Sequence, residues 1–255
     1  MKFGTDGVRG VAYTELTTEF AEQLARAAAV EFLLPNRTVV IGGDTRESTP
    51  DFVAALADGF RSEAVDVIDL GVVPTPLVAF EAQRRDAIGA MVSASHNPYA
   101  DNGIKLFAHG GAKLRDEVQA RIEGGLERDE EPAIADRRGD ITSESDHTGY
   151  MSHVLSILEG RRLDGLSLVL DCANGAAHDV APRVFRAAGA DVHVIADEPD
   201  GRNINDGCGA TDTSALVAEV LRTGADVGVA LDGDADRLIA VDHTGAVVDG
   251  DHVIA

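Results

Sequence analysis

The sequence has few of the residues that build disulfide-rich, zinc-binding or membrane-spanning proteins. It contains no Trp, three Tyr and eight Phe, so Ala, Val, Leu and Ile must form most of its hydrophobic core. Its two cysteines, Cys172 and Cys208, are too few for a disulfide framework or a zinc site, and we expect both to be reduced thiols. No apolar run reaches the ~18 residues of a membrane helix, and the first ten residues lack the apolar stretch of a signal peptide. We therefore expect a cytoplasmic protein.

Basic residues are also scarce. Asp and Glu number 44 against 22 Lys and Arg, which gives a net charge of −22, and only Lys2, Lys105 and Lys113 are lysines. A chain of this charge repels a phosphate backbone and an anionic membrane at long range. We expect neither nucleic acid nor a membrane among its partners.

What the sequence does contain is an alternation of strand-like and helix-like segments. The expected strands are 38–43, 65–70, 87–92, 103–108, 166–170, 192–196, 227–231 and 238–241. The expected helices are 17–33, 49–61, one opened by Pro74 and Pro76, 115–126, 150–158, 176–188 and 213–222. Such alternation predicts an α/β fold with mainly parallel mixed sheets covered by helices.

One charged segment divides this pattern. Residues 127–146 are rich in acidic and basic side chains and poor in apolar ones, which favours a linker over an ordered acidic surface loop. We predict two consecutive α/β domains, at 1–146 and 147–246. Residues 247–255 read as the opening of another apolar element, and we interpret them as the start of a truncated third domain.

A first chemically distinctive segment is AMVSASHNPYADNGIK, residues 90–105. An expected strand ends at Val92 and gives way to small polar residues, where sites of α/β sheets gather, so Ser95 and His96 are well placed for chemistry. Neighbouring residues of an extended backbone point in opposite directions, so His96 is a poor general base for Ser95. The G-x-S-x-G frame of a hydrolase is absent. A plain turn is the alternative interpretation.

A second segment, VGVALDGDADR, places Asp232, Asp234 and Asp236 directly after an expected buried strand. Three crowded carboxylates repel one another unless a cation compensates them, and oxygen ligands favour Mg²⁺. A calcium-binding EF-hand loop is excluded, because Arg237 occupies the position that requires Gly and His243 the position that requires the bidentate Glu. An aspartyl-phosphate phosphatase and a merely solvated acidic loop remain alternatives.

Together the two segments indicate phosphoryl transfer. Three carboxylates would nearly neutralise Mg²⁺ and leave positions open for phosphate oxygens, while Ser95 could hold a phosphoryl group as an ester. Lys105 would add a positive charge or a proton donor.

Several motifs then identify a family that the sequence resembles. SASHNP (93–98) followed by NGIK (102–105) resembles the phosphoserine loop of the α-D-phosphohexomutases, and DGDADR (232–237) resembles their metal loop. Three further motifs resemble the bacterial phosphoglucosamine mutase branch of that family: FGTDGVRG (3–10), NIN (203–205) and CGATD (208–212). The resemblance extends over nearly the whole chain, with the motifs in the family's order, and implies the first two α/β domains of a phosphohexomutase.

The resemblance implies a role for each matching residue. Ser95 would carry the exchanged phosphoryl group, and the carboxylates of Asp232, Asp234 and Asp236 would bind one Mg²⁺ together with an oxygen of that phosphate. The residues implied beside the transferring group are His96, Lys105, Arg9 and Arg237. Asp44 and Arg46 match a family segment that supports the loops, and for Arg9 and Arg46 a structural ion pair is the alternative to a catalytic role.

The implied reaction interconverts glucosamine 6-phosphate and glucosamine 1-phosphate through a phosphoserine enzyme and glucosamine 1,6-bisphosphate, which would also be the activator. The implied partners are the phosphosugar and a second copy in a homodimer. Family members have four domains, and the G-E-x-S-G-type sugar loop and R-x-S-G-T-type phosphate loop of the last two do not occur in this sequence. We therefore expect an incomplete fragment that is inactive by itself. The alternatives are a phosphoglucomutase or phosphomannomutase, or a non-catalytic module that binds phosphate and metal.

Overall fold

The computed structural model describes residues 3–4, 7–32, 37–126 and 137–248, and groups the chain into two compact units. The first unit comprises Met1–Gly43, Ser48–Ala94 and Ala100–Ser145. The second comprises Asp146–Ala255 and two short segments from earlier in the sequence, Asp44–Glu47 and Ser95–Tyr99. The loop that carries Ser95 therefore belongs to the same unit as the acidic motif near residue 232.

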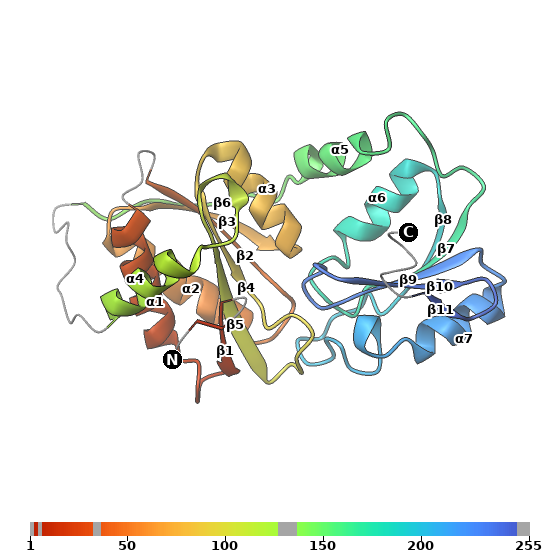
Figure 1. Cartoon of the computed structure of the whole chain (residues 1–255), viewed down its shortest axis with the longest axis horizontal. Helices are drawn as coiled ribbons and strands as arrows, with labels where there is room; N and C mark the ends of the chain where they lie inside the picture. Colours follow the sequence, from red (N-terminus) through yellow and green to blue (C-terminus); the bar gives the residue numbers. More distant parts are fainter. Residues whose placement is uncertain (1–2, 5–6, 33–36, 127–136, 249–255) are drawn as a thin grey trace. The chain divides into compact units, whose positions relative to one another are not determined.

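The first unit is a six-stranded mixed sheet with helices on both faces (Figure 1). Its strands are β1 (Val8–Val11), β2 (Thr38–Gly43), β3 (Asp66–Val72), β4 (Ile88–Val92), β5 (Asp101–Phe107) and β6 (Ile141–Ser143). Its α-helices are α1 (Thr18–Phe32), α2 (Thr49–Ser62), α3 (Thr75–Arg85) and α4 (Asp116–Leu126). The strand order is β1-β5-β4-β2-β3-β6, with β4, β2, β3 and β6 parallel and the β1–β5 and β5–β4 pairs antiparallel.

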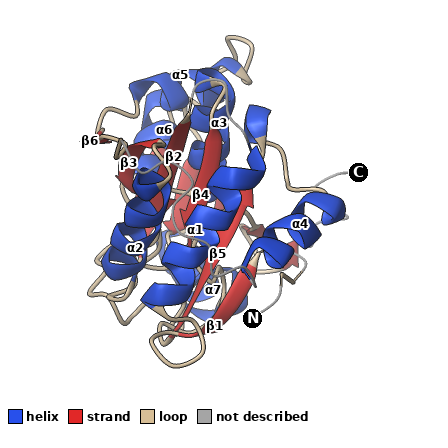
Figure 2. Ribbon diagram, turned by 90° about the vertical axis from the view of Figure 1, so that its left-hand side faces the viewer, coloured by secondary structure: helices blue, strands red, loops and turns tan. Residues whose placement is uncertain are grey.

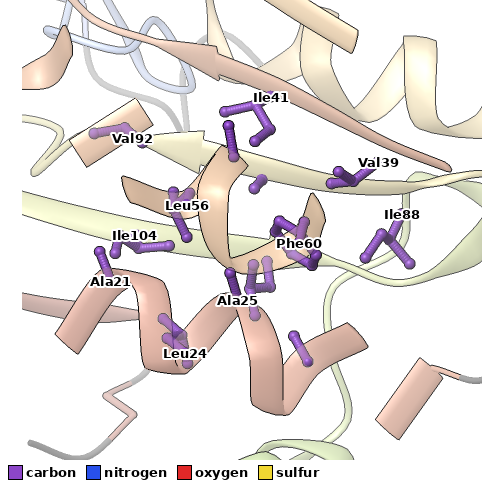
Figure 3. Packing of buried hydrophobic residues seen from close by; sticks show 14 of the residues in the cluster. Ala21, Leu24, Ala25, Val39, Ile41, Leu56, Phe60, Ile88, Val92 and Ile104 are labelled. Carbon is purple, nitrogen blue, oxygen red and sulfur yellow. The ribbon is translucent and has the colours of Figure 1, made fainter. Parts of the chain in front are cut away.

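Successive residues of β2 face opposite sides of the sheet, and different helices cover the two sides. Helix α1 buries Ala21, Leu24, Ala25 and Ala28, the spacing of one helical face, in the same cluster as Ile41 of β2. That cluster also contains apolar residues of α2 and α4 (Figure 3), and Figure 2 shows α1 and α2 in front of the sheet. On the opposite face, the space beside the Gly42 Cα is filled by Val78 of α3, so α3 packs there.

The second unit is built on the same plan with five strands. Its strands are β7 (Ser167–Asp171), β8 (Asp191–Ile195), β9 (Val227–Leu231), β10 (Leu238–Asp242) and β11 (Val247–Val248), and its α-helices are α5 (Thr148–Ser156), α6 (Val180–Ala188) and α7 (Ser214–Thr223). The order is β11-β10-β9-β7-β8, with β9, β7 and β8 parallel and β10 and β11 antiparallel to their neighbours. Leu168 and Leu170 of β7 pack in the cluster with Phe185 of α6, whereas Val169 packs with Leu216 of α7.

The predicted fold class is confirmed, because both units are α/β with mixed sheets flanked by helices. Three short strands, β1, β6 and β11, were not expected. Strand β6 lies within the segment interpreted as a linker, and that interpretation is wrong for residues 141–143, which pair in parallel with β3. A three-residue exposed edge strand is too short to show a hydrophobic pattern.

The limits of the predicted domains remain a proposal. Val247 and Val248 pair with β10 and so belong to the second sheet. The rest of the segment interpreted as the start of a third domain, 249–255, lies outside the described residues, as does the linker part 127–136. No helix in the described part of the chain is long and apolar enough to cross a bilayer.

Candidate functional site

Ser95 has an unusual backbone conformation for a serine. It follows β4 in the sequence, its side chain is buried, and its φ angle is +55°, in the left-handed region. Residues other than glycine rarely adopt this region, and the surrounding structure must hold them there at a cost of about 1–3 kcal/mol. Ten other described residues besides glycine share this region, so the contacts of Ser95, and not its φ angle alone, mark it as a candidate functional residue.

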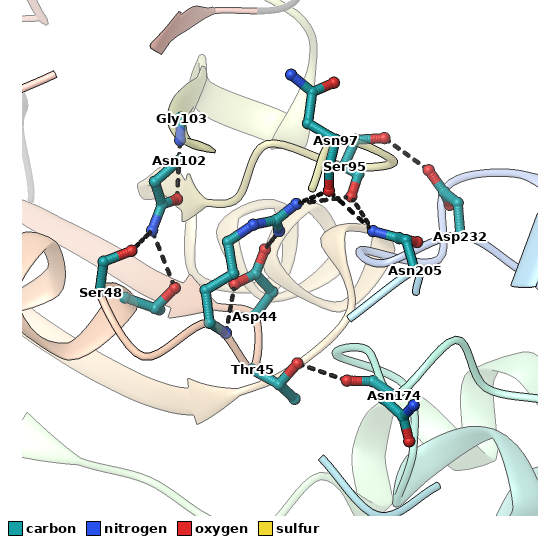
Figure 4. Close-up of polar contacts among 12 residues, drawn as sticks. Asp44, Thr45, Ser48, Ser95, Asn97, Asn102, Gly103, Asn174, Asn205 and Asp232 are labelled. Carbon is teal, nitrogen blue, oxygen red and sulfur yellow. Dashed lines mark hydrogen bonds and ion pairs between the residues drawn. The ribbon is translucent and has the colours of Figure 1, made fainter. Parts of the chain in front are cut away.

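Two side chains from other loops hold the backbone around Ser95 (Figure 4). Arg46 donates from Nη2 to the carbonyl oxygens of Ser95, at 3.2 Å, and Asn97, at 2.6 Å. Asn205 donates from Nδ2 to the same two carbonyl oxygens, at 3.0 and 3.2 Å. Arg46 is itself fully buried and forms an ion pair with Asp44.

The Ser95 hydroxyl contacts the acidic loop that follows β9. Its Oγ donates a hydrogen bond to Oδ2 of Asp232 at 2.6 Å, and the backbone N–H of Arg237 donates to Oδ1 of the same carboxylate at 3.1 Å. Asp232 and Asp234 are buried, whereas the side chain of Asp236 is 29% exposed. The second unit thus brings the candidate phosphoserine and the three expected metal ligands together.

The three carboxylates are placed to hold a cation. One oxygen of each lies within 4.8 Å of the others. Two ligands of Mg²⁺ are at most about 4.2 Å apart, so a small closing movement would suffice, and carboxylate oxygens are the donors that this ion prefers. Burial and then the neighbouring Asp234 raise the pKa of Asp232 to about 6, against the opposing effect of the Ser95 hydrogen bond. A bound cation would relieve this repulsion.

Gly233 allows the acidic loop to lie against the serine loop. A Cβ at this position would be 2.6 Å from the carbonyl oxygen of Ser95 and 2.8 Å from Nδ2 of Asn205. Both distances are too short for a real methyl group, so only glycine fits here without a shift of the backbone.

The structure also brings together two of the residues implied beside the transferring group. Nη1 of Arg237 lies 2.9 Å from Nδ1 of His96. Because a guanidinium can only donate, Nδ1 accepts and the ring proton of a neutral His96 sits on Nε2.

The other two residues implied at the transferring group lie in the first unit. Arg9 on β1 pairs with Gly103 of the neighbouring β5, and Lys105, also on β5, is buried opposite Met91. Their role at the site stays a prediction. Asn102 of the same motif is buried and donates to the hydroxyl of Ser48 at 2.9 Å, which fastens β5 to the start of α2.

The sequence motifs did not reveal what Asn205 does. Asn205 belongs to the NIN motif, but the motif does not indicate which residue it contacts. The contact depends on how the loop of Asn205, 110 positions from Ser95 in the sequence, folds back onto the serine loop. The neighbouring loop contact, in which Thr45 donates to the carbonyl oxygen of Asn174 at 2.6 Å, was equally unpredictable, since its acceptor is a backbone carbonyl of a residue outside the motifs.

With this geometry in place, comparison with known proteins identifies the family. Residues 1–133 match the model of phosphoglucomutase/phosphomannomutase alpha/beta/alpha domain I, and residues 148–245 match that of domain II. The chain belongs to the phosphoglucomutase/phosphomannomutase family. The resemblance stated from the sequence motifs is therefore confirmed at the level of the family.

Individual members of the family are similar over the whole chain. The phosphoglucosamine mutase of Rhodococcus opacus is 50% identical and that of Thermobifida fusca 51% identical, in each case over 99% of this chain and 58% of the relative. The crystal structure of a phosphoglucomutase/phosphomannomutase family protein from Burkholderia thailandensis superposes with a TM-score of 0.84 at 30% identity, covering 96% of this chain and 55% of that one. The chain thus spans 58% of the length of these two curated relatives.

Proposed function

We propose that this chain supplies the phosphoserine and metal loops of a phosphoglucosamine mutase, which interconverts glucosamine 6-phosphate and glucosamine 1-phosphate. The choice of glucosamine phosphate rests on the 50% and 51% identity with phosphoglucosamine mutases. The observation that carries the chemistry is the 2.6 Å hydrogen bond from the buried Ser95 to Asp232, one of three clustered carboxylates.

In this proposal Ser95 gives its phosphoryl group to the sugar monophosphate and takes one back from the 1,6-bisphosphate. In the first transfer the Oγ–P bond breaks, an O–P bond forms at the free sugar hydroxyl, and the proton of that hydroxyl is replaced by one gained at Oγ. In the second transfer the other sugar O–P bond breaks, the Oγ–P bond forms again, and the serine proton ends on the sugar oxygen that is released. Asp232, Asp234 and Asp236 would hold one Mg²⁺. When bound, this ion supplies positive charge opposite the phosphoryl oxygens. Arg237, His96, Lys105 and Arg9 are proposed to add positive charge or hydrogen bonds around the phosphoryl group.

The test is phosphorylation of the purified chain. The chain is incubated with Mg²⁺ and, in parallel samples, with glucosamine, glucose or mannose 1,6-bisphosphate, and its intact mass is followed with time. We expect the gain of one phosphoryl group, which is half of the mutase reaction. Complete turnover, which in the family also needs the sugar and phosphate loops, should stay negligible in this chain. The glucosamine assignment is tested on a longer protein that adds the sugar and phosphate loops to these residues. Faster turnover of glucose or mannose phosphate than of glucosamine phosphate would contradict the assignment and favour a phosphoglucomutase or phosphomannomutase. No mass gain with any donor would contradict phosphoryl transfer and favour a non-catalytic module.

A further inference from the structure

The backbone on either side of His96 is held by a shared pair of donors. The carbonyl oxygens of Ser95 and Asn97 each accept one hydrogen bond from Arg46 and one from Asn205, at distances between 2.6 and 3.2 Å. Both donors come from segments distant in sequence, so the Ser95 loop is fixed from outside in addition to its own turn.

These contacts bear directly on the conformation of Ser95. A carbonyl oxygen lies in the plane of its peptide, so fixing the oxygens of residues 95 and 97 fixes the peptide planes that follow these two residues. The first of these planes is attached to the Cα of Ser95. The left-handed φ of Ser95 is unfavourable for a residue with a Cβ and needs such external support. The same φ sets the direction of the Cα–Cβ bond, and with it the direction of the hydroxyl toward Asp232.

Asn205 is itself fixed to the sheet of the second unit. Its backbone N–H donates to the carbonyl oxygen of Ala173 at 3.0 Å, and the N–H of Ala173 donates to the buried carboxylate of Asp171 at the end of β7. The partners of the Asn205 amide fix which way it faces, because only Nδ2 can donate to two carbonyl oxygens. Its Oδ1 is buried and accepts no hydrogen bond from the described residues. The donor half of this amide therefore makes the contact with the serine loop.

We propose that Asn205 is a positioning residue for phosphoryl transfer: through its Nδ2 it holds the Ser95 and Asn97 carbonyls and thereby aims the Ser95 hydroxyl at the metal loop. This inference rests on the proposed function of Ser95. Asn205 acts through the backbone of the serine loop, and its contribution is to the geometry of the reacting hydroxyl. Its loss should slow the transfer step without weakening the binding of either Mg²⁺ or the sugar bisphosphate.

The test compares Asn205→Ala with a matched control two residues away. The side chain of Asn203 makes its hydrogen bonds with Asp200 and Glu198, at 3.0 Å each, so Asn203→Ala removes the same amide from the same loop without touching the serine loop. For each protein, the rate of Ser95 phosphorylation is measured against the concentration of glucosamine 1,6-bisphosphate, and Mg²⁺ affinity of the unphosphorylated chain is measured by calorimetry.

We expect Asn205→Ala to lower the maximal rate constant about tenfold, since two neutral hydrogen bonds are lost, with the half-saturating bisphosphate concentration and the Mg²⁺ affinity within about twofold of the original. Asn203→Ala should stay within about twofold throughout. If Asn205→Ala is unfolded at the assay temperature, Asn205→Leu carries the test, because it roughly keeps the side-chain volume and removes the N–H donors without adding a charge; it too should be slow.

An Asn205→Ala chain that phosphorylates Ser95 as fast as the unsubstituted chain would overturn the positioning role and leave the proposed function intact. Equal loss of rate and of Mg²⁺ affinity would overturn it as well, since the residue would then support the metal loop. An unsubstituted chain that takes up no phosphoryl group would overturn the proposed function and this inference together.

Discussion

The hydroxyl of Ser95 donates a hydrogen bond to the carboxylate of Asp232 at 2.6 Å, although 137 positions separate the two residues in the sequence. Asp234 and Asp236 offer oxygens within 4.8 Å of that of Asp232. A phosphoryl group on Ser95 would thus be attached beside a cluster of three negative charges. Phosphorylation of Ser95 and cation binding by the three carboxylates are therefore expected to affect each other.

The first prediction concerns Mg²⁺ affinity. Phosphorylation adds a charge of about −1.5 to −2 and new oxygen ligands beside the three carboxylates, so we expect Mg²⁺ to bind the phosphorylated chain at least about tenfold more tightly than the unphosphorylated one. Calorimetric titration of the two forms checks this. Equal affinities would mean that the ion does not contact the phosphoserine.

The second prediction concerns Asp232. Replacing it by Asn keeps the shape and an oxygen that can accept from Ser95, but removes one charge of the three-carboxylate cluster. Asp232→Asn should therefore lower Mg²⁺ affinity about tenfold or more. Asp206→Asn is the control, because Asp206 is exposed, lies in the same unit and removes the same charge. Equal effects of the two substitutions would indicate a general charge effect and contradict a site at residues 232–236.

The third prediction concerns the close approach at Gly233. A methyl group there would meet the Ser95 carbonyl oxygen at 2.6 Å, so Gly233→Ala should lower the free energy of unfolding by about 1–3 kcal/mol and slow phosphorylation of Ser95. Gly149→Ala is the control, since Gly149 lies in α5 with nothing within 4 Å of an added Cβ. Denaturant unfolding of both variants is the measurement. Similar stabilities of the two would show that the loops are not packed as described.

The fourth prediction concerns the two cysteines. Burial raises the pKa of the Cys208 thiol to about 11 and that of Cys172 still further, so both thiols stay protonated in the folded chain at pH 8, where about one Cys208 in a thousand is a thiolate. An aromatic disulfide reagent that releases a coloured thiolate should therefore react slowly with both cysteines in the folded chain. It should react quickly with both after unfolding in urea. Raising the pH toward 10 should increase the Cys208 rate about tenfold per unit. Rapid labelling of a folded thiol at pH 8 would contradict the described burial.

Much of the fold was predictable from local patterns. Continuous apolar runs such as 227–231 coincide with buried strands, and Leu24 and Ala28, which fall at helical spacing in the expected helix 17–33, lie on the buried face of α1. The strands that escaped prediction have only two to four residues, too few to show a hydrophobic pattern by themselves. Strand β6, for example, depends on its pairing with β3 and not on its own three residues.

The candidate site was predictable in its residues and not in its geometry. Ser95 and Asp232 belong to motifs that indicate their chemistry, because polar residues directly after an apolar strand segment are easily recognised in a sequence. The contact of Asn205 with the carbonyl oxygens of that loop carries no such signal, since backbone carbonyls are present at every position. For Arg46 the resemblance implied loop support, but not which loop it holds. Only the folded chain shows that the serine loop belongs to the second unit.

The measurement that tests the central claim most directly is the location of the phosphoryl group. The chain is incubated with Mg²⁺ and glucosamine 1,6-bisphosphate, digested, and the phosphorylated residue identified by peptide fragmentation, alongside Ser95→Ala and Ser93→Ala, which removes the other hydroxyl of the same motif. We expect one phosphoryl group on Ser95, retained in Ser93→Ala and lost in Ser95→Ala. Phosphate found on Ser93, or label that persists in Ser95→Ala, would contradict it.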